Sequence, residues 1–418
     1  MGTPFGEPMG TPRVIQAWSS KPGGPEGRVR EYPKPMERES SLTSFCHGGI
    51  SMLTDVSIGL HESNIGRMEP MTSAEQQTLI WTGTYTADGG GRAEGIGALS
   101  AHPDGTLVWQ GTAVESDSPS FVAVHPTLPV VYAVAEQRQM VRSFRRSGEF
   151  RLEPFGDPQP AGEATCHVAV DPLGRFLTAA CWGDGQVLLY ELDHDGGITG
   201  RFVAAPSVDP HGSLAPGHPR QSRAHASLML SDGRVMTTDL GHDTLRVWRY
   251  EPGAGLVADH EVALPFGSGP RHLVQHHSGS VFVVSEYSIE VFVVKADAGT
   301  FKLISRGPAT SGGSLPDDSA AEICLDPEGN HAYVGVRGSN LISVLDVSPD
   351  GTGLSPIKDV PSGGNWPRHH LVRGHWLHVA HERSDNIATF ALDPATGLPG
   401  PLQQTLQAPS PTALVPAK

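Results

Sequence analysis

His167-Val-Ala-Val-Asp-Pro-Leu-Gly-Arg-Phe-Leu-Thr-Ala-Ala-Cys-Trp182, followed by Gln186-Val-Leu-Leu-Tyr-Glu-Leu192, is the clearest copy of a unit that repeats along this chain. The unit contains an apolar run, a turn with Pro and Gly, a second apolar run and, after a short gap, a third. Runs of about four to eight residues bounded by Pro, Asp and Gly are typical of strands joined by hairpins. Related copies begin at Phe121, Ala226, Leu273, Ile323 and Leu371.

A turn that ends in glycine follows the third run of each unit, and seven such turns are spaced 43 to 58 residues apart. They are His102-Pro-Asp-Gly105, Arg146-Ser-Gly148, Asp193-His-Asp-Gly-Gly197, Glu251-Pro-Gly-Ala-Gly255, Lys295-Ala-Asp-Ala-Gly299, Ser348-Pro-Asp-Gly351 and Asp393-Pro-Ala-Thr-Gly397. A recurrence in this range is typical of a propeller, in which each blade is a sheet of four strands.

The two ends of the patterned region complement each other. The pattern opens with Leu79-Ile-Trp-Thr-Gly-Thr-Tyr85, which matches the second strand of a unit. The missing first strand is supplied by Ala408-Pro-Ser-Pro-Thr-Ala-Leu-Val-Pro416, which resembles Asp117-Ser-Pro-Ser-Phe-Val-Ala-Val124. We therefore predict an all-β, seven-bladed β-propeller with four-stranded antiparallel blades over residues 77–418, closed by pairing of the N- and C-terminal strands. A β-sandwich would not explain the matching ends.

Composition narrows the class of protein further. Residues 1–76 are rich in Pro, Gly, Ser and charge, and we expect them to be a disordered extension. A net charge of -15 argues against nucleic acid or an anionic membrane as partner. The four scattered cysteines predict a reduced, cytoplasmic setting, and we find no signal peptide or membrane-spanning stretch. We expect a monomer.

Polar residues recur at one end of the predicted strands. In a propeller the first strand of each blade lines the central channel, so its start and the end of the second strand lie at the same mouth. The first-strand starts are Ser120, His167, His225, Arg271-His272, Glu322, Arg368-His369 and Thr412. The second-strand ends are Tyr85, Glu136, Trp182, Asp239, Glu286, Arg337 and Glu382. Charges gathered in one place need partners or a ligand, which predicts a functional site at this mouth.

The chain resembles the seven-bladed lactonases, a family that includes propeller-type 6-phosphogluconolactonases and a fungal carboxymuconate lactonizing enzyme. The resemblance rests on Trp81-Thr-Gly-Thr-Tyr-Thr86, Cys166-His-Val-Ala-Val-Asp-Pro172, Gly269-Pro-Arg-His272, Ser319-Ala-Ala-Glu-Ile323 and Pro367-Arg-His369. It implies that His225, Arg271, Glu286 and Arg337 are catalytic. The residues that would bind substrate are His167, His272, Glu322, Arg368 and His369.

These residue types suit the opening of a lactone ring by water. Either His225 or Glu286 could be the base, and the arginines offer fixed positive charge to an oxyanion, a carboxylate or a phosphate. The sequence has no tight metal-binding motif at the mouth, and we expect neither metal nor cofactor. The prediction is a hydrolase of the pentose phosphate pathway acting on a small anionic lactone, 6-phosphogluconolactone first. The alternatives are a carboxymuconate-type cycloisomerase and a non-catalytic propeller that binds a protein or ligand.

Overall fold

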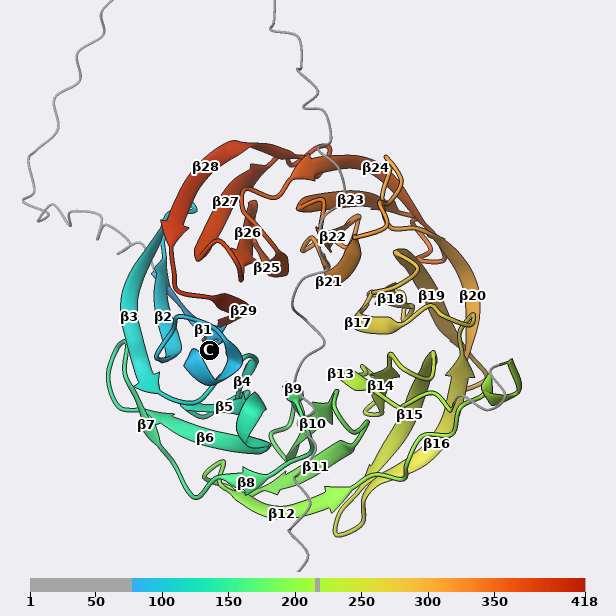
Figure 1. Cartoon of the computed structure of the whole chain (residues 1–418), viewed down its shortest axis with the longest axis horizontal. Helices are drawn as coiled ribbons and strands as arrows, with labels where there is room; N and C mark the ends of the chain where they lie inside the picture. Colours follow the sequence, from blue (N-terminus) through green and yellow to red (C-terminus); the bar gives the residue numbers. More distant parts are fainter. Residues whose placement is uncertain (1–76, 215–218, 418) are drawn as a thin grey trace, which may run out of the picture. The chain divides into compact units, whose positions relative to one another are not determined.

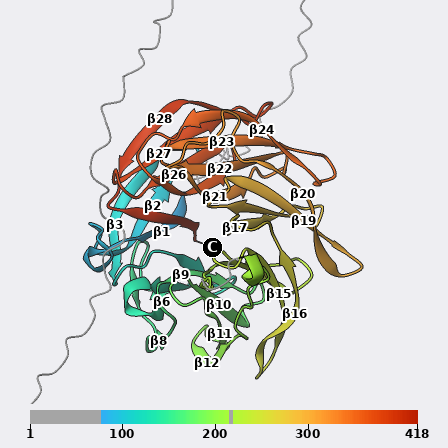
Figure 2. The same ribbon diagram turned by 45° about the vertical axis from the view of Figure 1, so that its right-hand side comes forward.

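Seven antiparallel β-sheets follow one another around a ring in the computed structural model, which describes residues 77–214 and 219–417 (Figure 1). The predicted seven-bladed propeller is thereby confirmed. The turned view in Figure 2 shows the same succession of blades. The predictions for residues 1–76 and for Lys418 lie outside the described residues.

In each blade the first strand lies at the channel and the fourth lies outermost (Figure 1). Blade 1 contains β29 (Pro411–Pro416), β1 (Thr78–Thr84), β2 (Gly95–Ala101) and β3 (Leu107–Glu115). Blade 2 contains β4 (Val122–Val124), β5 (Val130–Ala135), β6 (Met140–Arg146) and, in two pieces that both pair with β6, β7 (Leu152–Pro154) and β8 (Gln159–Pro160). Blade 3 contains β9 (Thr165–Val170), β10 (Phe176–Cys181), β11 (Val187–Leu192) and β12 (Ile198–Val203).

The remaining four blades have the same order. Blade 4 contains β13 (Ala224–Met229), β14 (Val235–Asp239), β15 (Thr244–Glu251) and β16 (Gly255–Ala263). Blade 5 contains β17 (Pro270–Gln275), β18 (Val281–Ser285), β19 (Glu290–Asp297) and β20 (Thr300–Pro308). Blade 6 contains β21 (Ser319–Leu325), β22 (His331–Arg337), β23 (Leu341–Val347) and β24 (Leu354–Pro361). Blade 7 contains β25 (Pro367–Arg373), β26 (Trp376–His381), β27 (Asn386–Leu392) and β28 (Pro399–Gln407). Three short 3₁₀ helices lie in loops, η1 (Ala87–Gly89), η2 (Glu136–Arg138) and η3 (Gly212–Leu214).

The ring closes as the sequence predicted. β29 pairs antiparallel with β1, with Trp81 opposite Val415 and Thr82 opposite Leu414, so blade 1 is built from both ends of the patterned region. All seven glycine turns lie between the third and fourth strands of their blades. A glycine is needed at Gly105, whose φ of 85° is in the left-handed region and whose Cβ position would lie 2.2 Å from the Trp376 ring.

The hydrophobic core consists of seven clusters, each shared by two neighbouring blades. Between blades 7 and 1, for example, Ile387 and Ala380 pack with Ile80 and Leu414. Strand side chains alternate between the two faces of a sheet, so each blade contributes one face to each of its two neighbours. This packing holds the inner strands at fixed positions around the channel.

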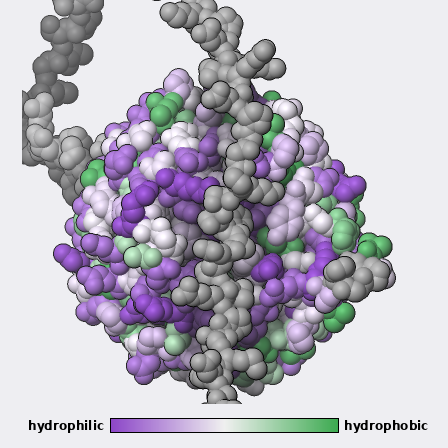
Figure 3. Space-filling view, viewed as in Figure 1, coloured by the Kyte–Doolittle hydropathy of each residue, from purple (hydrophilic) through white to green (hydrophobic). Residues whose placement is uncertain are grey.

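The surface is mainly polar on the side that Figure 3 shows, with hydrophobic residues scattered among hydrophilic ones. Among the described residues, no helix is long and apolar enough to cross a membrane.

Candidate active site

The inner strands are irregular where they start, at the mouth that the sequence predicted. In blade 3, Thr165 lies opposite Cys181 and His167 lies opposite Ala180, which leaves Cys166 as an extra residue on β9. Corresponding shifts occur in β13, β17, β21, β25 and β29. The residues in these bulges include Cys166, His225, Arg271, Glu322, Arg368 and Thr412. A bulge re-aims a side chain, and all six line one cavity.

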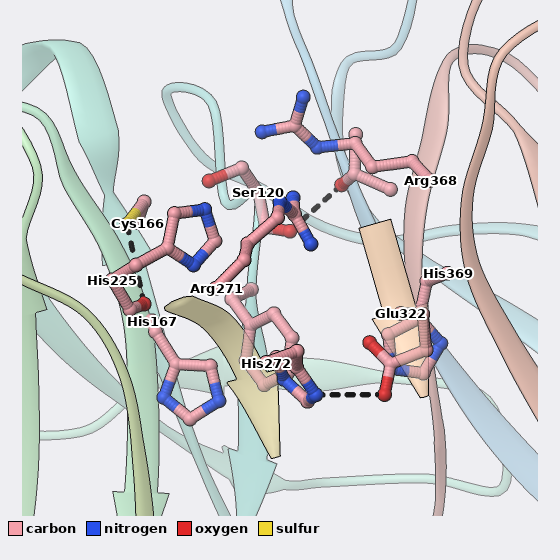
Figure 4. Close-up of a pocket in the computed structure, with 11 residues that line it drawn as sticks. Ser120, Cys166, His167, His225, Arg271, His272, Glu322, Arg368 and His369 are labelled. Atoms are coloured by element: carbon pink, nitrogen blue, oxygen red, sulfur yellow. Dashed lines mark hydrogen bonds and ion pairs between the residues drawn. The ribbon is translucent and has the colours of Figure 1, made fainter. Parts of the chain in front are cut away.

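The cavity gathers seven of the nine predicted site residues (Figure 4). They are His167, His225, Arg271, His272, Glu322, Arg368 and His369. The remaining two, Glu286 and Arg337, do not line the cavity and reach it only through Arg271. The space enclosed is about 20 Å³, which is room for one water molecule. A sugar-sized ligand would therefore lie at the entrance with only its reacting group inside.

Arg271 is held by a carboxylate that it shares with a second arginine. Oε2 of Glu286 lies 3.0 Å from Nε of Arg271 and 2.9 Å from Nη2 of Arg337. Nη1 of Arg271 also donates to the carbonyl of Ala321 over 2.7 Å. Burial alone would raise the pKa of Glu286, but the charges of Arg337 and Arg271 lower it. Glu286 is therefore an ionised anchor for two guanidinium groups.

Arg368 is held in the same manner from the opposite side of the cavity. Its Nη1 lies 3.0 Å from Oε2 of Glu382, and its Nη2 donates to the Tyr85 hydroxyl over 2.7 Å. That hydroxyl donates in turn to the Glu136 carboxylate, which also accepts from Ser120. Against the effect of burial, these neighbours raise the pKa of Arg368, so its charge is permanent.

His225 and His272 both lie near the Arg271 charge and have buried ring nitrogens without a hydrogen-bond partner among the described residues (Figure 4). Nδ1 of His272 lies beside Glu322, whereas His225 has no carboxylate of residues 77–214 and 219–417 within ion-pair distance. Nδ1 of His225 is buried and makes no hydrogen bond within the described part of the chain. Burial and then the Arg271 charge hold the pKa of His225 well below its ordinary value. A buried polar atom of this kind needs a partner, which a bound water or ligand would supply.

The other histidines surround Glu322 and Phe121. Nδ1 of His272 lies 2.8 Å from Oε1 of Glu322, and Nε2 of His369 lies 3.7 Å from Oε2. The Phe121 ring centroid lies 4.2 Å from that of His167 and 5.8 Å from that of His369. Burial lowers the pKa of His272 to about 3 and that of His369 to about 4, and it raises the pKa of Glu322. This end of the cavity is thus poor in charge.

The two sets of mouth residues have different positions. First-strand residues line the cavity, whereas second-strand residues support them from outside. Glu286, which is also paired with Arg337, holds Arg271. Tyr85 and Glu382 hold Arg368, and Glu136 accepts from Tyr85. Two second-strand residues do neither. Trp182 stacks under the Arg223 guanidinium at 3.9 Å, and Asp239 accepts from the backbone amides of Arg223, Gly241 and His242.

Four lining residues were not among the nine predicted site residues: Ser120 and Thr412, which were predicted only to lie at the mouth, and Cys166 and Phe121, which were not. Cys166 donates to the carbonyl of His225 over 3.5 Å, and burial raises the pKa of its thiol. The sequence contained a signal for Cys166, since it directly precedes His167 at the start of the first strand. Among the described residues, no group of three His, Cys, Asp or Glu side chains is arranged to hold a metal ion.

Comparison with known proteins agrees with this architecture. The family model described as lactonase, 7-bladed beta-propeller, matches residues 79–416. The chain belongs to this lactonase family. The 6-phosphogluconolactonase of Bacillus subtilis (strain 168) is 26% identical over 349 residues, which cover 80% of this chain and 97% of that protein. The 6-phosphogluconolactonase of Serratia proteamaculans (strain 568) is 24% identical over 289 residues, or 66% of this chain and 81% of that protein.

Solved lactonase-like structures share the fold. A putative 6-phosphogluconolactonase from Bacteroides fragilis NCTC 9343 superposes with a TM-score of 0.74 at 20% identity, covering 84% of this chain and 100% of that one. A periplasmic gluconolactonase from Pseudomonas aeruginosa gives a TM-score of 0.74 at 24% identity, covering 82% and 99%. The family that the sequence resembled is confirmed, and the seven blades of this chain are those of a lactonase-family propeller.

Proposed function

We propose that this protein hydrolyses the lactone of a sugar acid, with 6-phosphogluconolactone as the leading substrate. The observation that carries the proposal is the unpartnered, buried Nδ1 of His225 beside the Arg271 guanidinium, in a cavity with room for one water. Such a site combines a base, a nucleophile and a fixed positive charge. The names of the Bacillus and Serratia relatives support the choice of substrate.

In the proposed reaction the water lies in the cavity and the lactone carbonyl meets it at the entrance, while the ring stays outside. Neutral His225 takes a proton from the water, whose oxygen bonds to the carbonyl carbon. Arg271 donates to the oxyanion that develops, a contact worth roughly 3 to 4 kcal/mol for a single donor of this kind. The carbon–oxygen bond of the ring then breaks, and imidazolium returns the proton to the leaving ring oxygen. The product is the open-chain hydroxy acid.

The sequence left the base open between His225 and Glu286, and the geometry favours His225. Glu286 is ion-paired with two arginines and does not line the cavity, so it is poorly placed to accept a proton from water. We assign Glu286 and Arg337 as positioning residues that fix the direction of Arg271. Glu322 would orient His272 and His369 at the other end of the cavity.

The test is a panel of lactones assayed by acid release with the purified protein. It includes 6-phosphogluconolactone and glucono-1,5-lactone. A carboxymuconate, the open-chain substrate of the cycloisomerase alternative, is tested separately by following its absorbance. We expect hydrolysis of a sugar-acid lactone well above the spontaneous rate, and its loss in Arg271→Ala, which should still unfold cooperatively but at a lower Tm because Glu286 loses a buried partner. Turnover of carboxymuconate alone, or no turnover of any lactone, would overturn the proposal.

We also place this activity in the pentose phosphate pathway and in the cytoplasm. Because the Pseudomonas structural neighbour is a periplasmic protein, cell fractionation is the appropriate measurement of compartment. Recovery of the protein with a periplasmic marker would contradict this part of the proposal.

A further inference from the structure

Both arginines that line the inner cavity already have partners, so neither is free to bind a phosphate group. Arg271 is already bound to Glu286 and to a backbone carbonyl, and Arg368 is bound to Glu382 and Tyr85. The rest of the lining contains no Lys or Arg: it consists of four histidines, Ser120, Phe121, Cys166, Glu322 and Thr412, and the space is that of one water. A phosphate dianion that displaced Glu286 or Glu382 would leave a buried carboxylate without a partner, which is costly. A phosphorylated substrate needs a different place for this group.

A second cavity lies on the other side of the Arg368 network. It encloses about 240 Å³ and is lined by Tyr85, Glu382, Arg383, Ser410, Arg92 and the Gly89–Gly91 loop. Tyr85 and Glu382 therefore face this cavity while they hold Arg368, which faces the first one. The two cavities are therefore separated by Arg368 on one side and by Tyr85 and Glu382, which contact it, on the other.

Arg383 supplies an uncommitted positive charge to the second cavity. Within residues 77–214 and 219–417, no carboxylate lies within ion-pair distance of its guanidinium, although Arg92 next to it is paired with Asp385. The guanidinium is stacked 3.4 Å above the Trp366 ring, which has Arg337 at 5.4 Å. Stacking leaves the in-plane N–H groups of Arg383 available, and these match the oxygens of a phosphate.

Trp366 occupies its place at a conformational cost. Its φ of 70° is in the left-handed region, which bulky side chains rarely adopt, and its amide is held by Oδ1 of Asn340 at 2.7 Å. Residues kept in such conformations cluster at binding sites. The strained tryptophan fixes Arg383 beside the cavity.

We propose that the cavity lined by Arg383, Arg92 and the Gly89–Gly91 loop binds the phosphate monoester of the substrate, while the lactone carbonyl lies at the entrance of the neighbouring cavity, toward His225 and Arg271. This subsite rests on the proposed function, because it assumes that the substrate is a phosphorylated lactone. Glu382 also lines the cavity, but Arg368 already neutralises its charge.

The experiment compares two lactones that differ only in the phosphate. Values of kcat/KM are measured for 6-phosphogluconolactone and glucono-1,5-lactone with the wild type, Arg383→Gln and Arg223→Gln. Arg223 is a matched control, because it also stacks on a tryptophan, Trp182, but does not line the second cavity. Arg383→Gln is expected to lower kcat/KM for the phosphorylated lactone about tenfold or more, through KM, and to leave the other lactone within about twofold. Arg223→Gln is expected to change neither by more than about twofold.

An equal fall for both lactones in Arg383→Gln, or no fall for either, would overturn the subsite. Calorimetric titration with the products 6-phosphogluconate and gluconate separates this outcome from failure of the proposed function, because it requires no hydrolysis. If the wild type hydrolyses neither lactone, the proposed function fails. The subsite then stands only if Arg383→Gln weakens binding of 6-phosphogluconate about tenfold and leaves gluconate unchanged, and it falls if the two respond alike.

Discussion

Replacing Glu286 with glutamine would remove the negative charge between Arg271 and Arg337 while preserving the size of the side chain. Oε2 lies 3.0 Å from one guanidinium and 2.9 Å from the other, and both arginine side chains are only about 5% exposed. Breaking a buried pair by removing one partner costs about 3 to 5 kcal/mol, because an uncompensated charge remains. A propeller that spans residues 77–418 unfolds with an entropy of roughly 0.7 kcal/mol/K, so the Tm should fall by about 4 to 7 °C.

The effect of Glu286→Gln on catalysis distinguishes a positioning residue from a base. If His225 is the base, the variant loses part of kcat because Arg271 is no longer fixed, but kcat/KM still falls at low pH as His225 becomes protonated. Because Glu286→Gln removes a negative charge near His225, the pH at which kcat/KM falls should stay the same or decrease. The measurement is a pH–rate profile of lactone hydrolysis between about pH 4 and 8, with scanning calorimetry on the same samples.

If the fall of kcat/KM at low pH disappears in Glu286→Gln and persists in His225→Asn, then Glu286 and not His225 is the base. An unchanged Tm in Glu286→Gln would equally contradict the role of Glu286 as the shared counter-charge of two arginines.

Three further predictions concern the proposed base, the support of Arg368 and the buried histidines of blade 7. His225→Asn should lower kcat/KM by about 10²- to 10⁴-fold with little change in Tm, as steady-state kinetics and calorimetry would report. Tyr85→Phe removes an acceptor from Arg368, and KM should rise about tenfold while phenylalanine retains the ring packing. Stability should decrease with acidity, because burial lowers the pKa of His378 to about 3 and of His381 to about 4. The unfolded chain takes up these protons first, so from about pH 6.5 down to pH 4 the free energy of unfolding should fall by about 1.4 kcal/mol per pH unit for each histidine. Urea titrations at fixed pH would detect this, and a flat profile would contradict it.

The fold could be predicted from the sequence because its signals are local and repeated. Each glycine turn joins the third and fourth strands of its blade, and the first-strand pattern of residues 408–416 complements the second-strand pattern of residues 79–85, which explains how the ring closes. The same logic located the mouth, since strand direction alone puts His225 and Arg271 at one end of the channel.

Which mouth residues line the cavity and which support them from outside could not be predicted in this way. Bulges add one residue to a strand, and the strand alternation does not reveal which residue is extra; Cys166 and Arg271 are re-aimed by such bulges. Nor does one sequence indicate that Glu286 pairs with Arg271 across neighbouring second and first strands, or that Tyr85 reaches Arg368 from a different blade. The first pairing depends on the bulge that re-aims Arg271 and the second on the distance between two blades, and the local pattern encodes neither.

The most direct measurement is a crystal structure of the protein with 6-phosphogluconate bound. We expect the product carboxylate to lie within hydrogen-bond distance of the Arg271 guanidinium and of the His225 imidazole, in the cavity at the start of the inner strands. Product bound at any other surface, with this cavity filled only by solvent, would contradict it.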